Sequence, residues 1–322
     1  GRGRLLLRIS QFLPLAPSPF AMLRSLARLT SSGIGATRPK FLMCRPTYFD
    51  VNYSINPWMS QKEPANRMKA NEQWESLREN IIAAGGVVQI MEPDGGEDFP
   101  DLVFTANAAL VSGRLAYLAT FAYPQRAGET ALNREFFRKS GYTVIEDAHN
   151  FFEGAGDALF AGYSNVLFSG YGQRSSAGSA IKVAASLSTP QIGCKAFRPS
   201  KTGASSLHIR VVPCHLISPR FYHLDVAFCP LNESLALWHP AAFDPDTNRR
   251  LANHIKLLQV PECEASNFAC NAVVVNDTVI LQKGNPLTGK LLQRHGFAVS
   301  FVDMSEFIKA GGSAKCCTLR LE

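Results

Sequence analysis

The clearest pattern in the chain is a repeated pair of short apolar runs on either side of a turn. Such a pair, separated by Gly, Asn or Asp, predicts a β-hairpin. Four segments have this pattern: AALVSGRLAYLA (108–119), DALFAGYSNVLFSG (157–170), VAFCPLNESLALWH (226–239) and AVVVNDTVILQ (272–282). We therefore expect four hairpins spread along the chain.

Each hairpin is followed by a stretch compatible with a helix. These stretches are 128–140, 177–187, 246–257 and 285–295, with a further one at 72–84. Three helices end alike, with a glycine suited to the left-handed conformation and then an apolar strand: AAGGVVQIMEP, KSGYTVIED and RHGFAVSFVD. The predicted repeating unit is strand–strand–helix–strand.

Four copies of this unit are complete, and a fifth can be assembled from the two ends of the chain. Its parts are FLMC near residue 41, the helix at 72–84, a strand at 87–91 and the final CCTLRL. Five units around an axis, closed by the first and last strands, would leave no exposed sheet edge. We therefore predict a single α/β domain over 38–322. The irregular stretch 189–210 does not fit, and we interpret it as a surface insertion or an error in the gene sequence.

Charge changes this picture only at the start of the chain. The formal net charge is +7, and residues 1–40 carry seven basic residues and no acidic one, so the remainder is neutral overall. Without a basic surface, binding of nucleic acid has no support. No uninterrupted apolar run approaches the length of a membrane span, which argues against a membrane protein.

Residues 1–37 are typical of a targeting segment rather than of a folded domain. From Met22 on, MLRSLARLTSSGIGATR places Arg24 and Arg28 four residues apart among leucines, as in an amphipathic cationic helix suited to mitochondrial import. The alternative is a disordered tail on a cytoplasmic protein, which could include translated upstream sequence because the first residue is Gly. We expect a mitochondrial or a cytoplasmic protein.

The chain has eight cysteines and no CxxC spacing that would suggest zinc. Most of them lie in apolar contexts, so we expect free thiols in a reducing compartment and no metal. Cys316 and Cys317 are adjacent, between a glycine-rich loop and an apolar run. Because neighbours along a strand face opposite ways, one of the two should face a site and the other the core.

Candidate catalytic and binding side chains occur in the segments that lead into the first strand of each unit. If the units are equivalent, all five segments emerge at the same end of the fold, where functional loops are often grouped. Carboxylates there could orient a cation, a thiolate could attack it, and an imidazole could move protons. The candidates are Asp101, Asn107, Glu153, Asp157, His223, Asp225 and Cys316.

The same segments resemble a known family. FLMCRPTYFDVNYSINPWM, PDLVFTANA, FEGAGDALF, FYHLD, NFACNAV and KAGGSAKCCTLRL together resemble the guanidine-modifying hydrolases of the amidinotransferase or pentein superfamily. The likeness is greatest to arginine dihydrolases and to sequences similar to dimethylarginine dimethylaminohydrolase, and it covers essentially all of 38–322. It implies a five-fold pseudosymmetric α/β propeller, which agrees with the five units counted above, and neither a metal nor an organic cofactor.

The resemblance also implies a role for each candidate. Cys316, in the GGSAKC pattern, would be the nucleophile, and Cys317 would point into the sheet packing. His223 would be the general acid and base, and Glu153 the main anchor of the guanidinium. The implied substrate-binding residues include Asn107, Asp157, Asp101 and Asp225. Asn56, Arg126 and Arg174 would bind the amino-acid end of the substrate, and the alternative for these three is surface salt bridging.

The implied activity is hydrolysis of the guanidinium group of L-arginine through a covalent thiouronium intermediate, with release of ammonia and ornithine or citrulline. Within the same class, the alternative is a dimethylargininase that releases dimethylamine and citrulline from methylated arginine. From another class, the alternative is a catalytically silent propeller that serves as a binding scaffold. We expect a small-molecule substrate and no nucleic-acid or membrane partner, and a homo-oligomer stays open.

Two positions bear on the choice of substrate. Where relatives have HLDT, this chain has Val226, which removes a hydroxyl group next to the site. Asn107 occupies a position where arginine deiminases carry Asp. After one hydrolytic round the ligand end is a neutral urea, to whose oxygen an amide can donate a hydrogen bond and an ionised carboxylate cannot. Asn107 therefore predicts that arginine is carried through to ornithine and two ammonia molecules.

Overall fold

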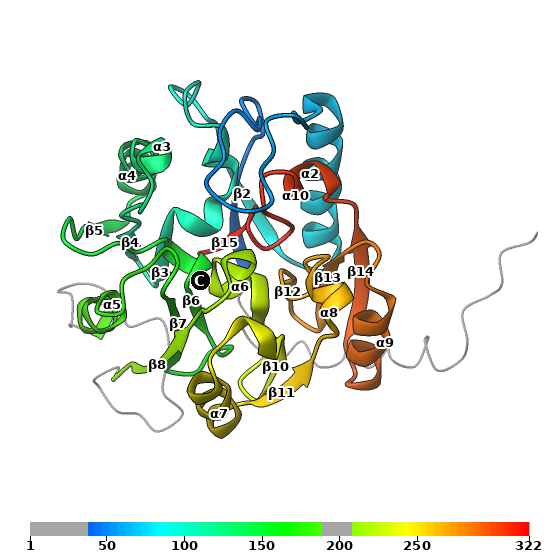
Figure 1. Ribbon diagram of the computed structural model, residues 1–322. Helices are drawn as coiled ribbons and strands as arrows, with labels where there is room; N and C mark the ends of the chain where they lie inside the picture. Colours follow the sequence, from blue (N-terminus) through cyan, green and yellow to red (C-terminus); the bar gives the residue numbers. More distant parts are fainter. Residues whose placement is uncertain (1–37, 189–207, 322) are drawn as a thin grey trace, which may run out of the picture. The chain divides into compact units, whose positions relative to one another are not determined.

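The four predicted hairpins are present in the computed structural model, which describes residues 38–188 and 208–321 (Figure 1). Each hairpin supplies two antiparallel strands of a three-stranded sheet, and the third strand pairs in parallel with the second. The strands are β3 (Ala109–Ser112), β4 (Leu115–Leu118), β5 (Thr143–Ile145), β6 (Ala158–Phe160), β7 (Val166–Tyr171), β8 (Arg210–His215), β9 (Phe228–Pro230), β10 (Leu235–Trp238), β11 (Lys256–Gln259), β12 (Val273–Val275), β13 (Thr278–Gln282) and β14 (Ala298–Val302).

The two ends of the described chain form a fifth sheet of the same kind, as predicted. Its central strand is β1 (Lys40–Cys44), with β2 (Val87–Met91) parallel to it on one side and β15 (Leu319–Arg320) antiparallel on the other. β15 is shorter than the predicted run CCTLRL, because both cysteines lie in a turn before it. The five sheets therefore share one strand order.

A helix connects the second strand to the third in every sheet and packs against that third strand. Figure 1 shows these helices outward of the strands of their own sheets. One predicted helix, 246–257, is wrong at its end, because Ile255 is already extended and the apolar run after it forms β11. The helices are α2 (Arg67–Ala83), α4 (Glu129–Lys139), α5 (Ser179–Ser188), α7 (Pro245–His254) and α9 (Pro286–Arg294).

The glycine stops predicted for three helices are confirmed. Gly85, Gly141 and Gly296 have φ angles of 94°, 76° and 90°. Glycine enters this left-handed region without the steric cost that a Cβ brings, so each helix can end there and the chain can turn into a strand. The prediction for 189–210 falls largely outside the described residues.

Short turns lead into the first strand of each sheet and contact one another. The turn η2 contacts η3, and η3 contacts α6. Asn271 hydrogen-bonds to Asp225 and to Cys316, and the Cys316 carbonyl accepts from Ala106 N. All five segments thus lie together, as predicted. They are η2 (Thr105–Asn107), η3 (Gly154–Gly156), α6 (Leu224–Ala227), the stretch after α8 (Glu262–Ala265) and the turn at 314–317.

The interior is largely apolar. Trp74 on α2, Phe137 on α4 and Phe228 on β9 are among the largest fully buried side chains, and they anchor their elements to the neighbouring sheets. None of the helices within the described ranges is both long enough and apolar enough to cross a bilayer.

Candidate active site

A small cavity of about 10 Å³ lies where the short turns meet. Its charged and polar lining side chains are at most 9% exposed. Charges held in such surroundings interact more strongly than they do in water. Six of the predicted site residues line the cavity together with Ile55, Phe104, Tyr222 and Gly312, and these six are Asn56, Asp101, Asn107, Arg126, Arg174 and Cys316.

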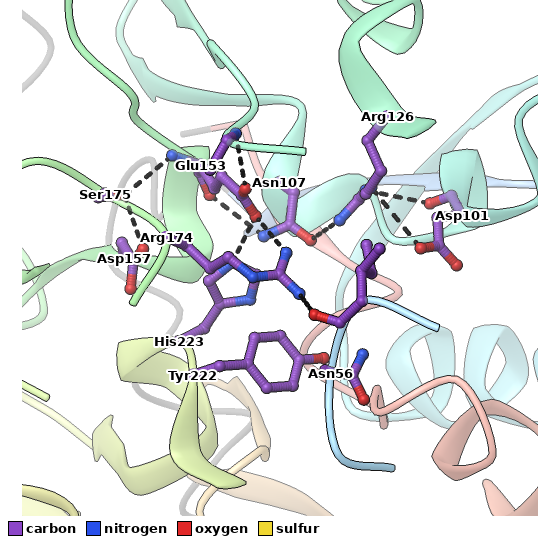
Figure 2. Close-up of polar contacts among 12 residues, drawn as sticks. Asn56, Asp101, Asn107, Arg126, Glu153, Asp157, Arg174, Ser175, Tyr222 and His223 are labelled. Carbon is purple, nitrogen blue, oxygen red and sulfur yellow. Dashed lines mark hydrogen bonds and ion pairs between the residues drawn. The ribbon is translucent and has the colours of Figure 1, made fainter. Parts of the chain in front are cut away.

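Glu153 is fully buried and joins two other predicted residues (Figure 2). Its Oε2 atom lies 2.7 Å from His223 Nε2 and accepts a hydrogen bond from Arg174 Nη1 at 3.1 Å. Its Oε1 atom accepts from Ala122 N at 3.2 Å. Burial alone would raise the pKa of Glu153, but Arg174 and His223 hold that pKa well below its usual range. Glu153 is therefore ionised, and protein groups occupy both of its oxygens.

The Arg174 guanidinium lies between two aromatic rings. Its Cζ atom is 4.6 Å from the ring centroid of Tyr123 and 4.6 Å from that of Tyr222, and its Nη2 donates to Ile55 O at 2.9 Å. A cation over an aromatic face is attracted by the ring quadrupole. Since Arg174 is also only 4% exposed, the alternative of a surface salt bridge is wrong for this residue.

Arg126 and Asn107 form a second buried network. Arg126 makes a two-pronged ion pair with Glu129 at 2.7 and 2.9 Å, and its Nη1 donates to Asn107 Oδ1 at 2.9 Å. Asn107 Nδ2 in turn donates to the Glu153 carbonyl at 3.1 Å. A guanidinium only donates and a carbonyl only accepts, so these partners allow one orientation of the amide. Its second N–H has no partner among the residues that the structure describes, so it can donate to a ligand.

Two acids flank the Arg126 guanidinium. The Asp101 carboxylate lies 3.8 Å from Arg126 Nε, and the Asp101 carbonyl accepts from Nη2 at 3.2 Å. Burial raises the pKa of Asp101 and raises that of Glu129 to about 7, while Arg126 opposes both shifts. Protein groups thus satisfy Arg126, which is buried rather than in a surface salt bridge and serves to hold Asn107.

Asp157 connects loops and does not line the cavity. Its Oδ1 accepts from Leu224 N at 2.9 Å, and its Oδ2 accepts from Ser175 Oγ at 2.6 Å. Ser175 Oγ also accepts from Glu153 N at 3.0 Å. Burial raises the pKa of Asp157 to about 6. The structure therefore places this acid where it ties the His223 segment to the loop that carries Arg174.

Gly156 allows the close approach of Asn107 and His223. A Cβ at this position would lie 2.4 Å from Asn107 Nδ2 and 3.4 Å from His223 Cγ. Any side chain here would push the amide and the imidazole apart. The FEGAGD segment thus needs its second glycine for packing at the site.

Asn56 fixes the INPWM loop beside the glycine-rich loop that leads to Cys316. Its Oδ1 accepts from Trp58 N at 2.9 Å, and its Nδ2 donates to Ala310 O at 3.1 Å. Tyr222 donates from its hydroxyl to Gly311 O at 2.6 Å. Both polar groups of Asn56 are used internally, so surface salt bridging does not describe this residue either.

Cys316 and Cys317 lie in the turn at 314–317, so the prediction that they enter a strand is wrong. Cys317 N donates to Ser313 O at 3.3 Å and helps close the turn. Cys316 lines the cavity, while Cys317 is fully buried in the core beneath β1. As expected, one thiol faces the cavity and the other lies in the core. This arrangement results from the turn at 314–317 and not from the alternation of side chains along a strand.

The Cys316 sulfur contacts two polar side chains and the backbone of Ser313. It lies 3.9 Å from both carboxylate oxygens of Asp225, and Asn271 Nδ2 donates to it at 3.1 Å. Burial and then Asp225 raise the pKa of the Cys316 thiol, and burial raises that of Asp225 to about 7. The thiol is therefore protonated in these surroundings, and a cation bound beside it would favour the reactive thiolate.

Sequence reasoning missed four residues that shape the site. The first is Asn271, which holds Cys316; it is the second asparagine of NFACNAV, a segment expected to converge there. Tyr222 stands next to the predicted histidine and carries no motif signal of its own. Glu129 and Ser175 act through Arg126 and Asp157, and nothing in their spacing pointed to those contacts.

The arrangement suits thiol chemistry on a planar cation. Cys316 is the nucleophile candidate, and its sulfur contacts the Asp225 carboxylate and the Asn271 amide. His223 Nε2 is taken by Glu153, while its buried Nδ1 has no hydrogen-bond partner within 38–188 and 208–321. In the same ranges no group of three or more His, Cys, Asp or Glu side chains is placed to hold a metal ion.

Comparison with known proteins gives one family match and several relatives. Residues 38–322 match the family described as N,N dimethylarginine dimethylhydrolase, eukaryotic. The chain is 40% identical over 290 residues to the bifunctional arginine dihydrolase/ornithine cyclodeaminase AgrE of Nostoc sp., with 88% of this chain and 38% of AgrE covered. It is 33% identical over 297 residues to the N(G),N(G)-dimethylarginine dimethylaminohydrolase of Mycobacterium tuberculosis, with 92% and 90% covered.

Two solved structures of one bacterial domain are also similar. The first is the N-terminal domain of ArgZ bound to product, an arginine dihydrolase from the Ornithine-Ammonia Cycle in Cyanobacteria, with a TM-score of 0.79, 39% identity and coverage of 89% of this chain and 98% of that one. A variant of the same domain covalently bound to a reaction intermediate has a TM-score of 0.78 at 38% identity, with coverage of 88% and 98%. The chain spans 38% of the length of AgrE but nearly all of the ArgZ domain.

Proposed function

The chain belongs to the N,N dimethylarginine dimethylhydrolase family, and from this premise we propose that it is a cysteine-dependent hydrolase of the guanidinium group of L-arginine. One observation carries the proposal: the Cys316 thiol and the Asn107 amide line the same small, buried cavity. A relative named for arginine dihydrolase activity is 40% identical, against 33% for the M. tuberculosis dimethylarginine relative.

We propose that different residues bind the two ends of arginine. We place the amino-acid end of arginine against Arg174 and Asn56, which both line the cavity, because a guanidinium can pair with a carboxylate. Asp225, beside the sulfur, meets the substrate guanidinium through charge-assisted hydrogen bonds. Glu153 holds His223 through Nε2 and so sets the tautomer of the imidazole.

The first hydrolytic round needs only these side chains. The Cys316 thiolate forms a bond to the guanidinium carbon, and ammonia leaves as a C–N bond breaks and His223 donates a proton. Water that gives a proton to His223 then attacks the carbon of the thiouronium intermediate. The C–S bond breaks, citrulline forms and the thiolate is restored. A relative that forms a covalent intermediate supports this course.

A second round at the same sulfur gives ornithine. The urea oxygen of citrulline repels carboxylates, but the remaining N–H of Asn107 can donate to it. A second attack by Cys316 breaks the bond to the other terminal nitrogen, which leaves as ammonia, and gives a thiocarbamate. Water cleaves its C–S bond and restores the thiol, and the carbamate that forms on ornithine loses carbon dioxide. Overall, one arginine and two water molecules give ornithine, two ammonia molecules and carbon dioxide.

We also propose a fold type, a cellular location and an oligomeric state for the protein, each on its own observation. The shared strand order of the five sheets and the contacts among their entry turns support a five-fold pseudosymmetric α/β propeller with the site on its axis. Mitochondrial targeting by residues 1–37 rests on their cationic pattern. A homo-oligomer is also proposed, and light scattering of the purified protein would test it.

Product identification tests the function directly. Purified protein is given L-arginine, L-citrulline or asymmetric dimethylarginine, and amino acids and amines are identified by mass spectrometry. We expect ornithine and ammonia from arginine, and no product from any of the three with Cys316→Ser. Absence of every product with the wild type would refute a hydrolase and favour the silent scaffold.

A dimethylargininase is the second candidate. The family name and the M. tuberculosis relative favour it. Release of dimethylamine and citrulline from the methylated substrate, with no reaction of arginine, would establish this activity in place of the first.

A further inference from the structure

Asn271 lies between α8 and β12 and is fully buried beside the nucleophile. Its Oδ1 accepts from Cys316 N at 3.2 Å, and its Nδ2 donates to Cys316 Sγ at 3.1 Å. Nδ2 also donates to the Asp225 carbonyl at 3.2 Å. Because the Cys316 N–H must donate and the Asp225 carbonyl must accept, the amide has one orientation, with its N–H groups toward the sulfur.

A strained turn aims this side chain. Phe268, three residues earlier, has a φ of 60°, a region that residues with a Cβ adopt rarely and at an energetic cost. Its buried ring packs on Trp58 with centroids 4.7 Å apart, and its carbonyl accepts from Asn271 N at 3.0 Å. Trp58 is held in turn by a hydrogen bond from Nε1 to Arg220 O at 3.0 Å. Strain that the surroundings maintain in this way often marks a functional position.

Asn271 and Asp225 act on the sulfur in opposite directions. The Asp225 carboxylate disfavours a negative sulfur and raises the pKa of the Cys316 thiol, as burial does. The Asn271 N–H points at the same sulfur and stabilises negative charge there, since hydrogen bonds to ionised acceptors are stronger than those to neutral ones. An amide is required for this, because a carboxylate at the same place could not donate.

We propose that Asn271 is a positioning residue for the nucleophile: its amide fixes the Cys316 backbone and donates a hydrogen bond to the sulfur as the thiolate forms. The inference rests on the proposed function of Cys316 and adds a residue to it. Asn271 contacts the Cys316 sulfur directly and is not among the cavity-lining residues, so we expect its main effect on bond formation at sulfur.

The test compares Asn271→Ala and Asn271→Asp with a matched control. Asn285 is also fully buried and donates from Nδ2 to two carbonyls, Asn267 O at 3.1 Å and Gln282 O at 2.9 Å, so Asn285→Ala reports the general cost of losing a buried amide. Alkylation of Cys316 by iodoacetamide is followed against pH by peptide mass spectrometry, beside kcat and KM for arginine.

We expect Asn271→Ala to lower kcat about 10- to 100-fold with KM within about twofold, by analogy with loss of a hydrogen bond to a charged group. The alkylation midpoint of Cys316 should rise by about one pH unit. Asn271→Asp keeps the size and the bond to Cys316 N but places an oxygen at the sulfur, so both effects should be larger. Asn285→Ala should change neither the midpoint nor KM.

An unchanged alkylation midpoint in both Asn271 variants would overturn the proposal, as would a loss confined to KM. If both variants fail to fold while Asn285→Ala folds, Asn271 is structural and the proposal is also wrong. A wild type that turns over no substrate refutes the proposed function alone, since the alkylation midpoints still decide whether Asn271 stabilises the thiolate.

Discussion

The exchange Asn107→Asp tests the proposed second hydrolytic round most directly. In the wild type, Asn107 Nδ2 donates to the Glu153 carbonyl at 3.1 Å and leaves its other N–H for the ligand, while Oδ1 is held by Arg126 at 2.9 Å. An aspartate keeps the contact with Arg126 but turns an oxygen toward the Glu153 carbonyl. Two acceptors then face each other in a buried site, and no donor remains for the urea oxygen of citrulline.

The size of the effect follows from those contacts. A buried acceptor that loses its partner costs about 1–3 kcal/mol, or roughly 5- to 150-fold in an equilibrium or rate. Loss of a donor to an oxygen that gains negative charge in the transition state typically costs about 10²–10³-fold. We therefore expect hydrolysis of citrulline to fall at least about 100-fold. Hydrolysis of arginine should fall less, because its guanidinium has no oxygen that needs the donor.

The assay is the ratio of ornithine to citrulline formed from arginine, with added citrulline as a second substrate. Asn285→Asp, a buried amide remote from the cavity, is the control for a general loss of stability, and thermal unfolding is measured for all variants. We expect the Asn107 variant to accumulate citrulline. If it hydrolyses citrulline as fast as the wild type, the reasoning about the amide donor is refuted.

Three further outcomes are expected. Cys316→Ser should abolish turnover, while Cys317→Ser should keep most of it. Activity assays and intact-protein mass spectrometry of the covalent adduct test this. An active Cys316→Ser variant with an inactive Cys317→Ser variant would reverse our assignment of the nucleophile. Because burial raises the pKa of Asp225 to about 7, its contribution to stability is present at low pH and is lost as the pH rises from about 4 to 7. The gain in Tm from Asp225→Asn should therefore be larger at pH 8 than at pH 4, and equal shifts would contradict the ionisation assigned to it. Deletion of residues 1–37 should leave activity intact and abolish mitochondrial localisation in fluorescence microscopy, and unchanged localisation would exclude a targeting role.

Much of the fold could be predicted because it repeats. A hairpin, a helix and a glycine stop recur with local signals strong enough to find each time, and the fifth sheet follows by completing the pattern from both ends. The end of α7 could not be found in this way, because no glycine separates the helix from β11. Whether such a run is helical or extended is decided by pairing with β10, which lies outside the local sequence.

For the site, the sequence identified which residues converge but not how they share partners. Glu153 was expected to anchor a substrate, yet both of its oxygens are taken by protein groups. Asp157 was placed in the same group and instead braces two loops. Such assignments depend on distances of a few ångströms between distant segments. Asn271 shows the converse, since a residue with no distinctive spacing donates a hydrogen bond to the Cys316 sulfur at 3.1 Å.

The sheet built from β1 and β15 has a consequence for the order of folding. These strands are separated by nearly the whole described chain, so their pairing has a high loop-closure cost and should form late, after the four locally connected sheets. The turn that carries Cys316 leads directly into β15. A partly folded chain would therefore contain most of the binding groups while its nucleophile is not yet in place. During refolding, recovery of enzymatic activity should lag behind recovery of secondary structure, and the lag would measure the rate at which the two chain ends meet.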